Sequence, residues 1–328
     1  GGTGGLGLLT GRWLAQQGAR RLVLASRGGA LAGDTGAEWE AVQASGATPR
    51  LAQCDAGEMA HVSRLVARAT PLSGVWHAAG VLLDALLPKQ DGGSFARVHG
   101  AKADGAQGLH AACVVAPLRA FSLFSSVAAL LGGGGQANYS AANVRLDVLA
   151  TARRAHGAVS ASVEWGPWAD VGMATRGRAK EHLAASGLLP IGLSQGLAVL
   201  GASVRCNVPA VMAMFPVVWS RVLSADVPSF LSAFAPSVAR PCVRSSTPAS
   251  ADAAGSGLTL ERVLELVKRT AGGSVDADAP LMEAGVDSLS AVELRNQLQS
   301  AAGGQSLPST LVFDYPTARQ LMCVLEPE

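Results

Sequence analysis

The stretch Gly1-Gly2-Thr3-Gly4-Gly5-Leu6-Gly7 stands at the start of the sequence and decides the fold. Directly behind it, a helical pattern of apolar residues runs from Leu8 to Gln17, and Gly18 is a natural helix stop. Glycines let a backbone approach a pyrophosphate, and free N–H groups at the start of the following helix stabilise its charge. The stretch therefore predicts a dinucleotide-binding loop. A flexible N-terminal turn is the alternative that the glycines alone leave open.

Outward from this loop, the first two thirds of the sequence alternate short β-branched or apolar runs with longer helical patterns. This alternation is typical of βαβ units wound into a parallel sheet. We predict an α/β fold of the Rossmann type, with a doubly wound parallel sheet. Such a sheet has a strand that enters the glycine loop, so we expect the first strand to be missing from this sequence. The predicted strands are residues 21–25, 48–53, 74–77, 120–125, 158–164 and 208–214.

The C-terminal part of the sequence differs in composition. Residues 236–257 are rich in Pro, Ser, Ala and Gly, which is typical of an interdomain linker. Beyond them, apolar residues recur at helical spacing in 258–270 and 288–300, and a shorter helix is predicted at 317–325. We therefore predict a nucleotide-binding domain at 1–235, a linker at 236–257 and a small all-α four-helix bundle at 258–328.

Composition narrows the class of protein further. The 328 residues exceed what one hydrophobic core usually supports, and 49% of them are apolar. A net charge of +2 with interspersed acids and bases does not indicate a nucleic acid partner. The five cysteines lie far apart and form no C-x-x-C pair, so we expect neither a disulfide framework nor a metal site. No apolar run is long enough to span a membrane. We expect a cytoplasmic setting and leave open a targeting signal upstream of Gly1.

The ends of the next two predicted strands carry candidate nucleotide contacts. The first ends in Ser26-Arg27, where a fold specific for NAD would place an acid for the ribose 2′-hydroxyl. An arginine instead offers a guanidinium fork for a 2′-phosphate, so NADPH is predicted over NADH. The second strand ends in Cys54-Asp55, where Asp55 would meet the adenine. The alternative is that Asp55 only caps the helix that begins near Gly57.

Two blocks in the middle of the sequence suggest a catalytic group. Residues 124–128 read Phe-Ser-Ser-Val-Ala, and residues 135–143 read Gly-Gln-Ala-Asn-Tyr-Ser-Ala-Ala-Asn. Over residues 1–219 the sequence resembles the short-chain dehydrogenase/reductase superfamily, and within it the ketoreductase domain of polyketide synthases. In that superfamily a catalytic Ser lies at a strand end, and the Tyr follows about thirteen positions later. Ser126 and Tyr139 fit this spacing.

The position four residues after the tyrosine refines the resemblance. Most of the superfamily has a Lys there, but this sequence has Asn143, and it supplies Lys102 from an earlier helix, as polyketide ketoreductases do. The resemblance implies that Tyr139 donates the proton and Ser126 holds the carbonyl oxygen. It also implies that Lys102 favours the phenolate and binds the nicotinamide ribose, while Asn143 orders a water. Taken one at a time, these residues have structural alternatives. Ser126 could form a hydrogen bond at a strand end, Lys102 could be a solvated charge on a helix, and Asn143 could be an amide on a helix surface.

Further positions relate to the nicotinamide and the stereochemistry of the product. Ala78-Ala79-Gly80 resembles the turn over the nicotinamide half of the cofactor. B-type ketoreductases usually show Leu-Asp-Asp where this sequence has Leu-Leu-Asp, so of the two aspartates only the last, Asp84, is retained. The A-type Trp is replaced by Leu131, and the resemblance favours a B-type alcohol. Met173 follows a Gly- and Pro-containing loop and is expected to line the acyl channel.

The C-terminal segment resembles an acyl carrier protein. Residues 281–295 contain Gly285-Val286-Asp287-Ser288-Leu289, the attachment pattern of that family. The resemblance implies that Ser288 receives 4′-phosphopantetheine from coenzyme A, at the start of a helix where N–H groups favour an anion. The alternative is that Ser288 merely caps that helix.

Together, the two resemblances imply part of a modular polyketide synthase. The predicted reaction is reduction of a carrier-tethered β-ketoacyl thioester to a β-hydroxyacyl thioester with NADPH. The implied partners are the ketosynthase and acyltransferase domains of the same assembly line and a phosphopantetheinyl transferase. Two alternatives stay open: a fatty-acid-type synthase with the same domain pair, and an inactive reductase scaffold in which only the carrier functions.

Overall fold

The computed structural model divides the chain into two compact units, Gly1–Val238 and Ala239–Glu328. The residues that it describes are 1–33, 35–169, 171, 187–205, 207–223, 227–234, 259–271, 276–282, 286, 288–302, 307 and 311–325. The predicted linker at 236–257 lies outside these residues. Each unit has a hydrophobic core of its own.

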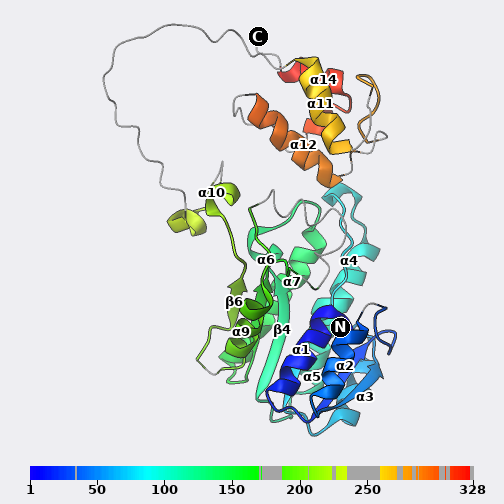
Figure 1. The fold of residues 1–328 in the computed structure, drawn as a ribbon, viewed down its shortest axis with the longest axis vertical. Helices are drawn as coiled ribbons and strands as arrows, with labels where there is room; N and C mark the ends of the chain where they lie inside the picture. The colour runs from blue at the N-terminus through cyan, green and yellow to red at the C-terminus, as the bar shows by residue number, and fades with distance from the viewer. Residues whose placement is uncertain are drawn as a thin grey trace, which may run out of the picture. The chain divides into compact units, whose positions relative to one another are not determined.

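In the described residues of the first unit, every pair of neighbouring strands runs parallel (Figure 1). Strand β1 (Arg21–Ser26) pairs with β2 (Thr48–Gln53), and a second sheet has the order β3-β4-β5-β6. The strands of this second sheet are β3 (Gly74–His77), β4 (Ala120–Ser126), β5 (Ala161–Trp165) and β6 (Val211–Met214). All of the strands are connected by helical segments, so the predicted α/β class with parallel strands is confirmed.

Strand β5 begins three residues later than predicted, at Ala161 instead of Ala158. The backbone N–H of Ala158 bonds to the carbonyl of Arg153, and the Arg153 guanidinium donates to the Val159 carbonyl. The segment before β5 is therefore held against the end of the preceding helix and does not join the sheet. Strand β6 likewise begins at Val211 instead of residue 208.

Helices cover both faces of the sheets. On one face, α1 (Gly5–Gln16), α2 (Gly36–Ala44) and α9 (Leu193–Ser203) pack on apolar side chains such as Leu22 and Phe124. On the other face, α5 (Gly105–Ala112) and α7 (Ala137–Ala155) pack on Phe121 and Leu123, and α3 (Met59–Ala69) packs in a neighbouring cluster that includes Val75 of β3. Successive residues of β4 therefore face opposite layers, as the strand period of two requires.

Further segments join these layers at the carboxyl ends of the strands. They are η1 (Leu87–Lys89), α4 (Gly92–His99), the π-helical segment η2 (Gly100–Asp104) and α6 (Ala128–Leu131). Helix α4 begins with a capping box, in which Asp91 accepts from the Ser94 N–H at 2.6 Å. The unit closes with α10 (Trp219–Val222) and η4 (Ser229–Phe234).

The second unit is a helical bundle. Its helices are α11 (Leu260–Ala271), α12 (Ser288–Ala301), α13 (Leu311–Asp314) and α14 (Ala318–Leu325). Their apolar faces meet in one core that includes Val267, Leu281, Leu294 and Leu321, each fully buried. The helices predicted at 258–270, 288–300 and 317–325 are present with bounds shifted by one or two residues.

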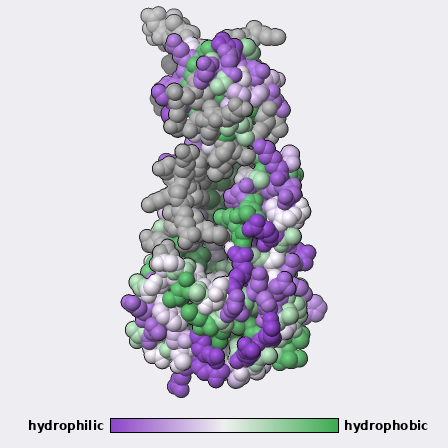
Figure 2. Space-filling view, turned by 90° about the vertical axis from the view of Figure 1, so that its right-hand side faces the viewer, coloured by the Kyte–Doolittle hydropathy of each residue, from purple (hydrophilic) through white to green (hydrophobic). Residues whose placement is uncertain are grey.

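The surface of the described residues mixes hydrophilic and hydrophobic side chains, as one face shows in Figure 2. Among these residues, no helix has both the length and the apolar character needed to cross a membrane.

Candidate functional site

The catalytic tyrosine and serine predicted from the sequence lie together at the carboxyl end of β4. Ser126 is the last residue of that strand, and Tyr139 lies in the first turn of α7. The Tyr139 side chain is buried, and burial raises the pKa of its hydroxyl above the ordinary value. Side-chain hydrogen bonds with Asn143 and Ser126 act in the opposite direction and favour the phenolate.

Lys102 reaches the same point from η2. Its Nζ donates a hydrogen bond of 2.7 Å to the carbonyl of Phe124 and lies 5.2 Å from the centre of the Tyr139 ring. The residue is only 3% exposed, so the alternative of a solvated helix charge is wrong. Desolvation lowers the pKa of Lys102 to about 7, although the Asp147 carboxylate raises it in part.

A buried histidine, His77, holds the backbone around Lys102. The His77 ring Nε2 lies 3.0 Å from the Lys102 carbonyl oxygen, and the ring is buried. Desolvation lowers the pKa of His77 to about 3, so the neutral ring donates this hydrogen bond near neutral pH. π-Helical turns occur frequently at functional sites, and here one carries the lysine.

Asn143 lies one helical turn after Tyr139 and is fully buried, so the alternative of a helix-surface amide is wrong. Its Nδ2 donates a 2.8 Å hydrogen bond to the Tyr139 carbonyl. Its Oδ1 accepts no hydrogen bond from the described residues, although it is buried. A buried acceptor without a partner is costly, so this oxygen is suited to a donor from substrate, cofactor or solvent.

The glycine loop packs so closely that side chains would not fit. A Cβ at Gly1 would lie 2.5 Å from the Ala78 carbonyl oxygen, and one at Gly2 would lie 2.8 Å from the Ala25 nitrogen. A Cβ at Gly7 would collide with the Gly1 carbonyl oxygen. Helix α1 begins at Gly5 rather than Leu8, because the Leu8 N–H already bonds to the Gly4 carbonyl. The loop thus leads directly into a helix, so the alternative of a flexible N-terminal turn is wrong.

The other loop residues lie beside this helix start. Thr3 is buried, and Leu6 packs partly against the core beneath α1. The loop lies against the backbone of Ala78 and Ala79, and the turn that includes Gly80 follows directly. The structure therefore brings the loop and the predicted nicotinamide turn together.

The polar residues at the ends of β1 and β2 differ in exposure and in hydrogen bonding. The Ser26 Oγ accepts from the Gly29 N–H at 3.2 Å, whereas Arg27 is exposed. The Asp55 carboxylate accepts from the Gly57 N–H at 3.1 Å. Because α3 begins only at Met59, Asp55 forms a turn before the helix and does not cap it.

The predicted stereocontrol residues lie beside the start of α7, as far as they are described. Asp84 is exposed and accepts a 3.1 Å hydrogen bond from Gln136 Nε2. The neighbouring Leu83 carbonyl accepts from Asn138 Nδ2 at 2.9 Å, so the loop is tied to the helix that carries Tyr139. Leu131 ends α6 and is partly buried, whereas Met173 lies outside the described residues.

Sequence reasoning missed a set of polar side chains behind Lys102. Asp147 accepts hydrogen bonds from Ser162 Oγ at 2.6 Å and from Ser125 Oγ at 3.2 Å. Glu164 is a buried residue of β5 and stands two residues after Ser162, so it faces the same side of that strand. One signal was available: Asp147 stands four residues after Asn143, on the same face of the helix.

Ser288 is the first residue of α12 in the second unit. The predicted attachment position thus coincides with a helix start, where backbone N–H groups lack helical partners. Among the described residues, no cluster of three or more His, Cys, Asp or Glu side chains has the arrangement of a metal site.

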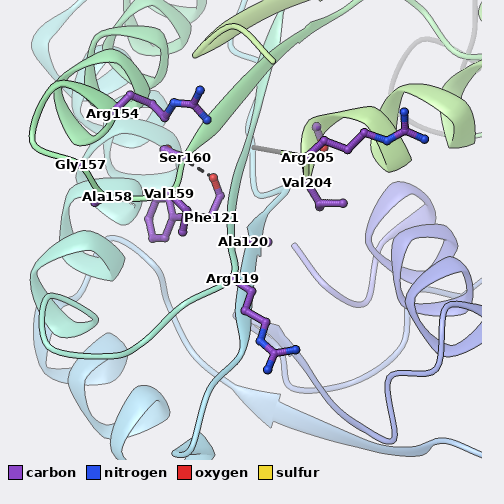
Figure 3. A pocket seen from close by; sticks show the side chains of 11 residues that line it. Arg119, Ala120, Phe121, Arg154, Gly157, Ala158, Val159, Ser160, Val204 and Arg205 are labelled. Carbon is purple, nitrogen blue, oxygen red and sulfur yellow. Dashed lines mark hydrogen bonds between the residues drawn. The ribbon is translucent and has the colours of Figure 1, made fainter. Parts of the chain in front are cut away.

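A separate cavity of about 260 Å³ lies at the amino end of β4, the opposite end from Ser126. In Figure 3, Arg119, Arg154 and Arg205 extend from it in different directions, and the Ser160 hydroxyl bonds to the Phe121 carbonyl. Arg154 donates to the Val208 carbonyl at 2.9 Å. These arginines therefore do not converge on one point, and the cavity has no part in the site above.

Two family models match the chain. The KR domain model matches residues 1–170, and the phosphopantetheine attachment site model matches residues 260–322. The chain is 37% identical to polyketide synthase GfsA of Streptomyces halstedii over 98% of its length. It spans only 5% of that relative.

Solved structures agree with these matches. A structure described as A-type ketoreductases from a modular polyketide synthase is 37% identical, with a TM-score of 0.64, over 67% of this chain and 47% of the other. The first ketoreductase of the tylosin polyketide synthase is 38% identical, with a TM-score of 0.63, over 72% of this chain and 51% of the other. The chain thus belongs to the ketoreductase (KR) domain family of modular polyketide synthases, and a phosphopantetheine-attachment domain follows the ketoreductase domain.

Proposed function

We propose that this chain reduces the β-keto group of an acyl thioester to a β-hydroxyl group with NADPH and carries acyl chains on Ser288. The observation that carries the proposal is the convergence of Tyr139 and Ser126 with the buried Lys102 at one end of β4. A solvated or scattered arrangement of these side chains would not support proton transfer to a developing oxyanion.

The residues present fit a dinucleotide. The loop glycines leave no room for side chains, which lets backbone approach a pyrophosphate, and α1 begins directly behind them. Residues 1–7 would hold the pyrophosphate, while Ser26 and the exposed Arg27 would hold a 2′-phosphate and favour NADPH. Asp55 would lie toward the adenine, and residues 78–80 toward the nicotinamide. When bound, the cofactor supplies the hydride.

The chain's own residues supply the proton and stabilise charge. As a hydride adds to the β-carbonyl carbon, the π electrons of the carbonyl move onto oxygen, and Tyr139 gives its hydroxyl proton to that oxygen. Ser126 donates a second hydrogen bond to the oxygen. The phenolate left on Tyr139 is stabilised by the ammonium of Lys102 and is then reprotonated through Asn143 and solvent. Asp84 and Leu131 would border the acyl chain and favour a B-type alcohol, with Met173 in the acyl channel.

The second unit would present the substrate. A phosphopantetheinyl transferase would join the phosphate of coenzyme A's pantetheine arm to Ser288 Oγ, releasing the adenosine bisphosphate part. Tethering raises the effective concentration of the acyl chain to around the millimolar range when the linker can span the sites. Ketosynthase and acyltransferase domains of the same assembly line would extend and load the chain. The free, buried Cys54 and Cys113 favour a reducing, cytoplasmic setting.

Consumption of NADPH with a β-ketoacyl thioester tests the reductase, with Tyr139→Phe as the matched control. Because a general acid contributes about 10²- to 10⁴-fold, the variant should lose activity by at least about 100-fold while it still binds NADPH. Binding of NADPH without reduction of any β-ketoacyl thioester would contradict the reductase.

Mass spectrometry after incubation with a phosphopantetheinyl transferase and coenzyme A tests the carrier. The chain should gain one phosphopantetheine group, and Ser288→Ala should gain none. If the chain gains phosphopantetheine but reduces no β-ketoacyl thioester, the alternative of an inactive reductase scaffold would be favoured instead.

A further inference from the structure

A pair of carboxyl groups, one buried and one partly exposed, lies near the catalytic lysine. Asp147 comes from α7, and Glu164, which is 7% exposed, comes from the central strand β5. Glu164 pairs with Ser125 in the register of β4 and β5, so its side chain lies on the face of the sheet where Ser125 contacts Asp147. Serine hydroxyls complete the arrangement, because Ser162 and Ser125 donate to the two oxygens of Asp147 at 2.6 and 3.2 Å.

The two carboxyl groups share one proton near neutral pH. Two ionised carboxylates held side by side repel each other, so the charge of one raises the pKa of the other. Burial, and then the neighbouring Asp147 charge, raise the pKa of Glu164 to about 7. Burial also raises the pKa of Asp147, although the hydroxyls of Ser162 and Ser125 lower it in part. Below about pH 7 the pair therefore carries one negative charge.

That charge acts on Lys102. Asp147 is the charged group that raises the pKa of Lys102 against desolvation, and Lys102 in turn favours ionised Asp147. Asp147 also stands one helical turn after Asn143, and the single hydroxyl proton of Ser125 is shared between the Asn143 carbonyl at 3.3 Å and the Asp147 carboxylate at 3.2 Å. The pair is thus connected to the catalytic group through the backbone of α7 as well as through charge.

Other titratable groups near Lys102 do not replace this charge. Tyr139 is the acid that Lys102 serves, and Asp84 acts on Tyr139. His77 is neutral near pH 7, because burial lowers its pKa to about 3. The remaining titratable side chains of α4, η2 and α5 either are exposed or contact other residues, and they are Arg97, Asp104, His99 beside Phe95, and His110 beside Arg153. On α7, Arg145 is exposed and Arg154 donates to the Val208 carbonyl.

Water can reach one end of the pair. A groove of about 370 Å³ runs along α7, and Asp147 lines it together with Val144, Val148 and Thr151. Glu164 remains buried behind Asp147. Protons can therefore exchange between solvent and the pair without opening the site around Tyr139.

We propose that Asp147 and Glu164 are positioning residues that share one proton and hold one negative charge behind Lys102, so that its ammonium stays charged beside Tyr139. This inference rests on the proposed reductase function, because a charged Lys102 is useful only if Tyr139 donates a proton. Its physical content, the effect of the pair on Lys102, can be measured without turnover.

NMR of the full chain labelled with ¹³Cε-lysine measures this effect in the absence of cofactor. The sequence has four lysines, Lys89, Lys102, Lys180 and Lys268, and the Lys102 signal is identified by its loss in Lys102→Met. In Asp147→Asn/Glu164→Gln the pair has no charge but keeps amide hydrogen bonding. The titration midpoint of Lys102 should then fall by about one pH unit or more.

The single variant Glu164→Gln leaves one charge on Asp147, so its Lys102 midpoint should remain within about half a pH unit of the unmodified chain. The same change at an exposed acid, Asp104→Asn, is the matched control and should leave the midpoint in place. An unmoved midpoint in the double variant would overturn the inference, even if the chain reduces thioesters.

A second measurement covers the case in which the double variant does not fold. In Glu164→Gln, the ¹³C carboxyl titration near pH 7 should disappear, while a signal that persists there would overturn the shared proton. Failure of Tyr139→Phe to abolish reduction would count against the proposed function alone, so the two failures are distinguishable.

Discussion

The Nζ atom of Lys102 lies 5.2 Å from the centre of the Tyr139 ring, although Lys102 belongs to η2 and Tyr139 to α7. Two hydrogen bonds fix the lysine from opposite ends: its Nζ donates to the Phe124 carbonyl, and His77 meets its backbone carbonyl. A cation held beside a buried phenol stabilises the phenolate relative to the phenol. The ammonium form of Lys102 is therefore the state that serves proton donation by Tyr139.

The first prediction concerns pH. Burial lowers the pKa of Lys102 to about 7, so the ammonium form predominates below that pH and is lost above it. The kcat/KM of reduction should therefore fall as pH rises above about 7, through loss of one proton. In Lys102→Met, activity should drop by about 100-fold or more and this fall with pH should disappear.

Steady-state kinetics between pH 6 and about 9, a range that brackets this titration, checks the first prediction. Lys102→Arg is the matched variant, because a guanidinium stays charged throughout the range. If the unmodified chain keeps a constant kcat/KM across the range, Lys102 does not set the pH dependence.

The second prediction concerns the serine at the end of β4. Ser126→Ala removes one donor to the developing oxyanion, which typically costs about 10²- to 10³-fold in kcat. NADPH affinity should remain unchanged, because the hydroxyl serves the substrate oxygen. Ser160→Ala is a matched control, since the Ser160 hydroxyl bonds to the Phe121 carbonyl at the far end of the strand. An equal loss in both variants would point to damage to the strand and not to lost catalysis.

The third prediction concerns the glycine loop. An alanine Cβ at Gly7 would collide with the Gly1 carbonyl, so the loop must rearrange in Gly7→Ala. We expect NADPH binding to weaken by about tenfold or more, which corresponds to about 1.4 kcal/mol. Fluorescence titration with NADPH measures the affinity. Gly33→Ala is the control, because no atom lies within 4 Å of a Cβ built there. Similar affinities in the two variants would contradict a role for the loop in binding.

The parts that sequence reasoning could predict are those with local signals. Glycine spacing, strand ends and the offset from Ser126 to Tyr139 are all visible along the chain, and the structure brings Ser126, Tyr139, Lys102 and Asn143 to one end of β4. The alternation of apolar runs and helical patterns likewise gave the parallel strands and the covering helices.

The parts that could not be predicted depend on partners that are distant in sequence. A glutamate within a strand does not reveal which helix covers it, and Glu164 lies near Asp147 because β5 packs beneath α7. The late start of β5 has the same kind of cause, since Arg153 holds the preceding carbonyl. The burial of Lys102 follows from the π-helical turn and from the contact with His77. Neither feature can be predicted from the sequence around it.

The fourth prediction concerns the independence of the two units. Leu294 is fully buried in the core of the helical bundle, which consists entirely of residues from the second unit. Leu294→Ala should destabilise that unit by about 2–5 kcal/mol, because it removes buried methyl groups and leaves a cavity. Phosphopantetheine transfer to Ser288 should slow, while NADPH binding by the first unit stays unchanged.

Val324→Ala on α14 is the control, because Val324 is 42% exposed. Calorimetry of the full chain should show one unfolding transition shifted and the other in place. A shift of both transitions would mean that the units unfold as one body, and the carrier core would then not be an independent determinant of stability.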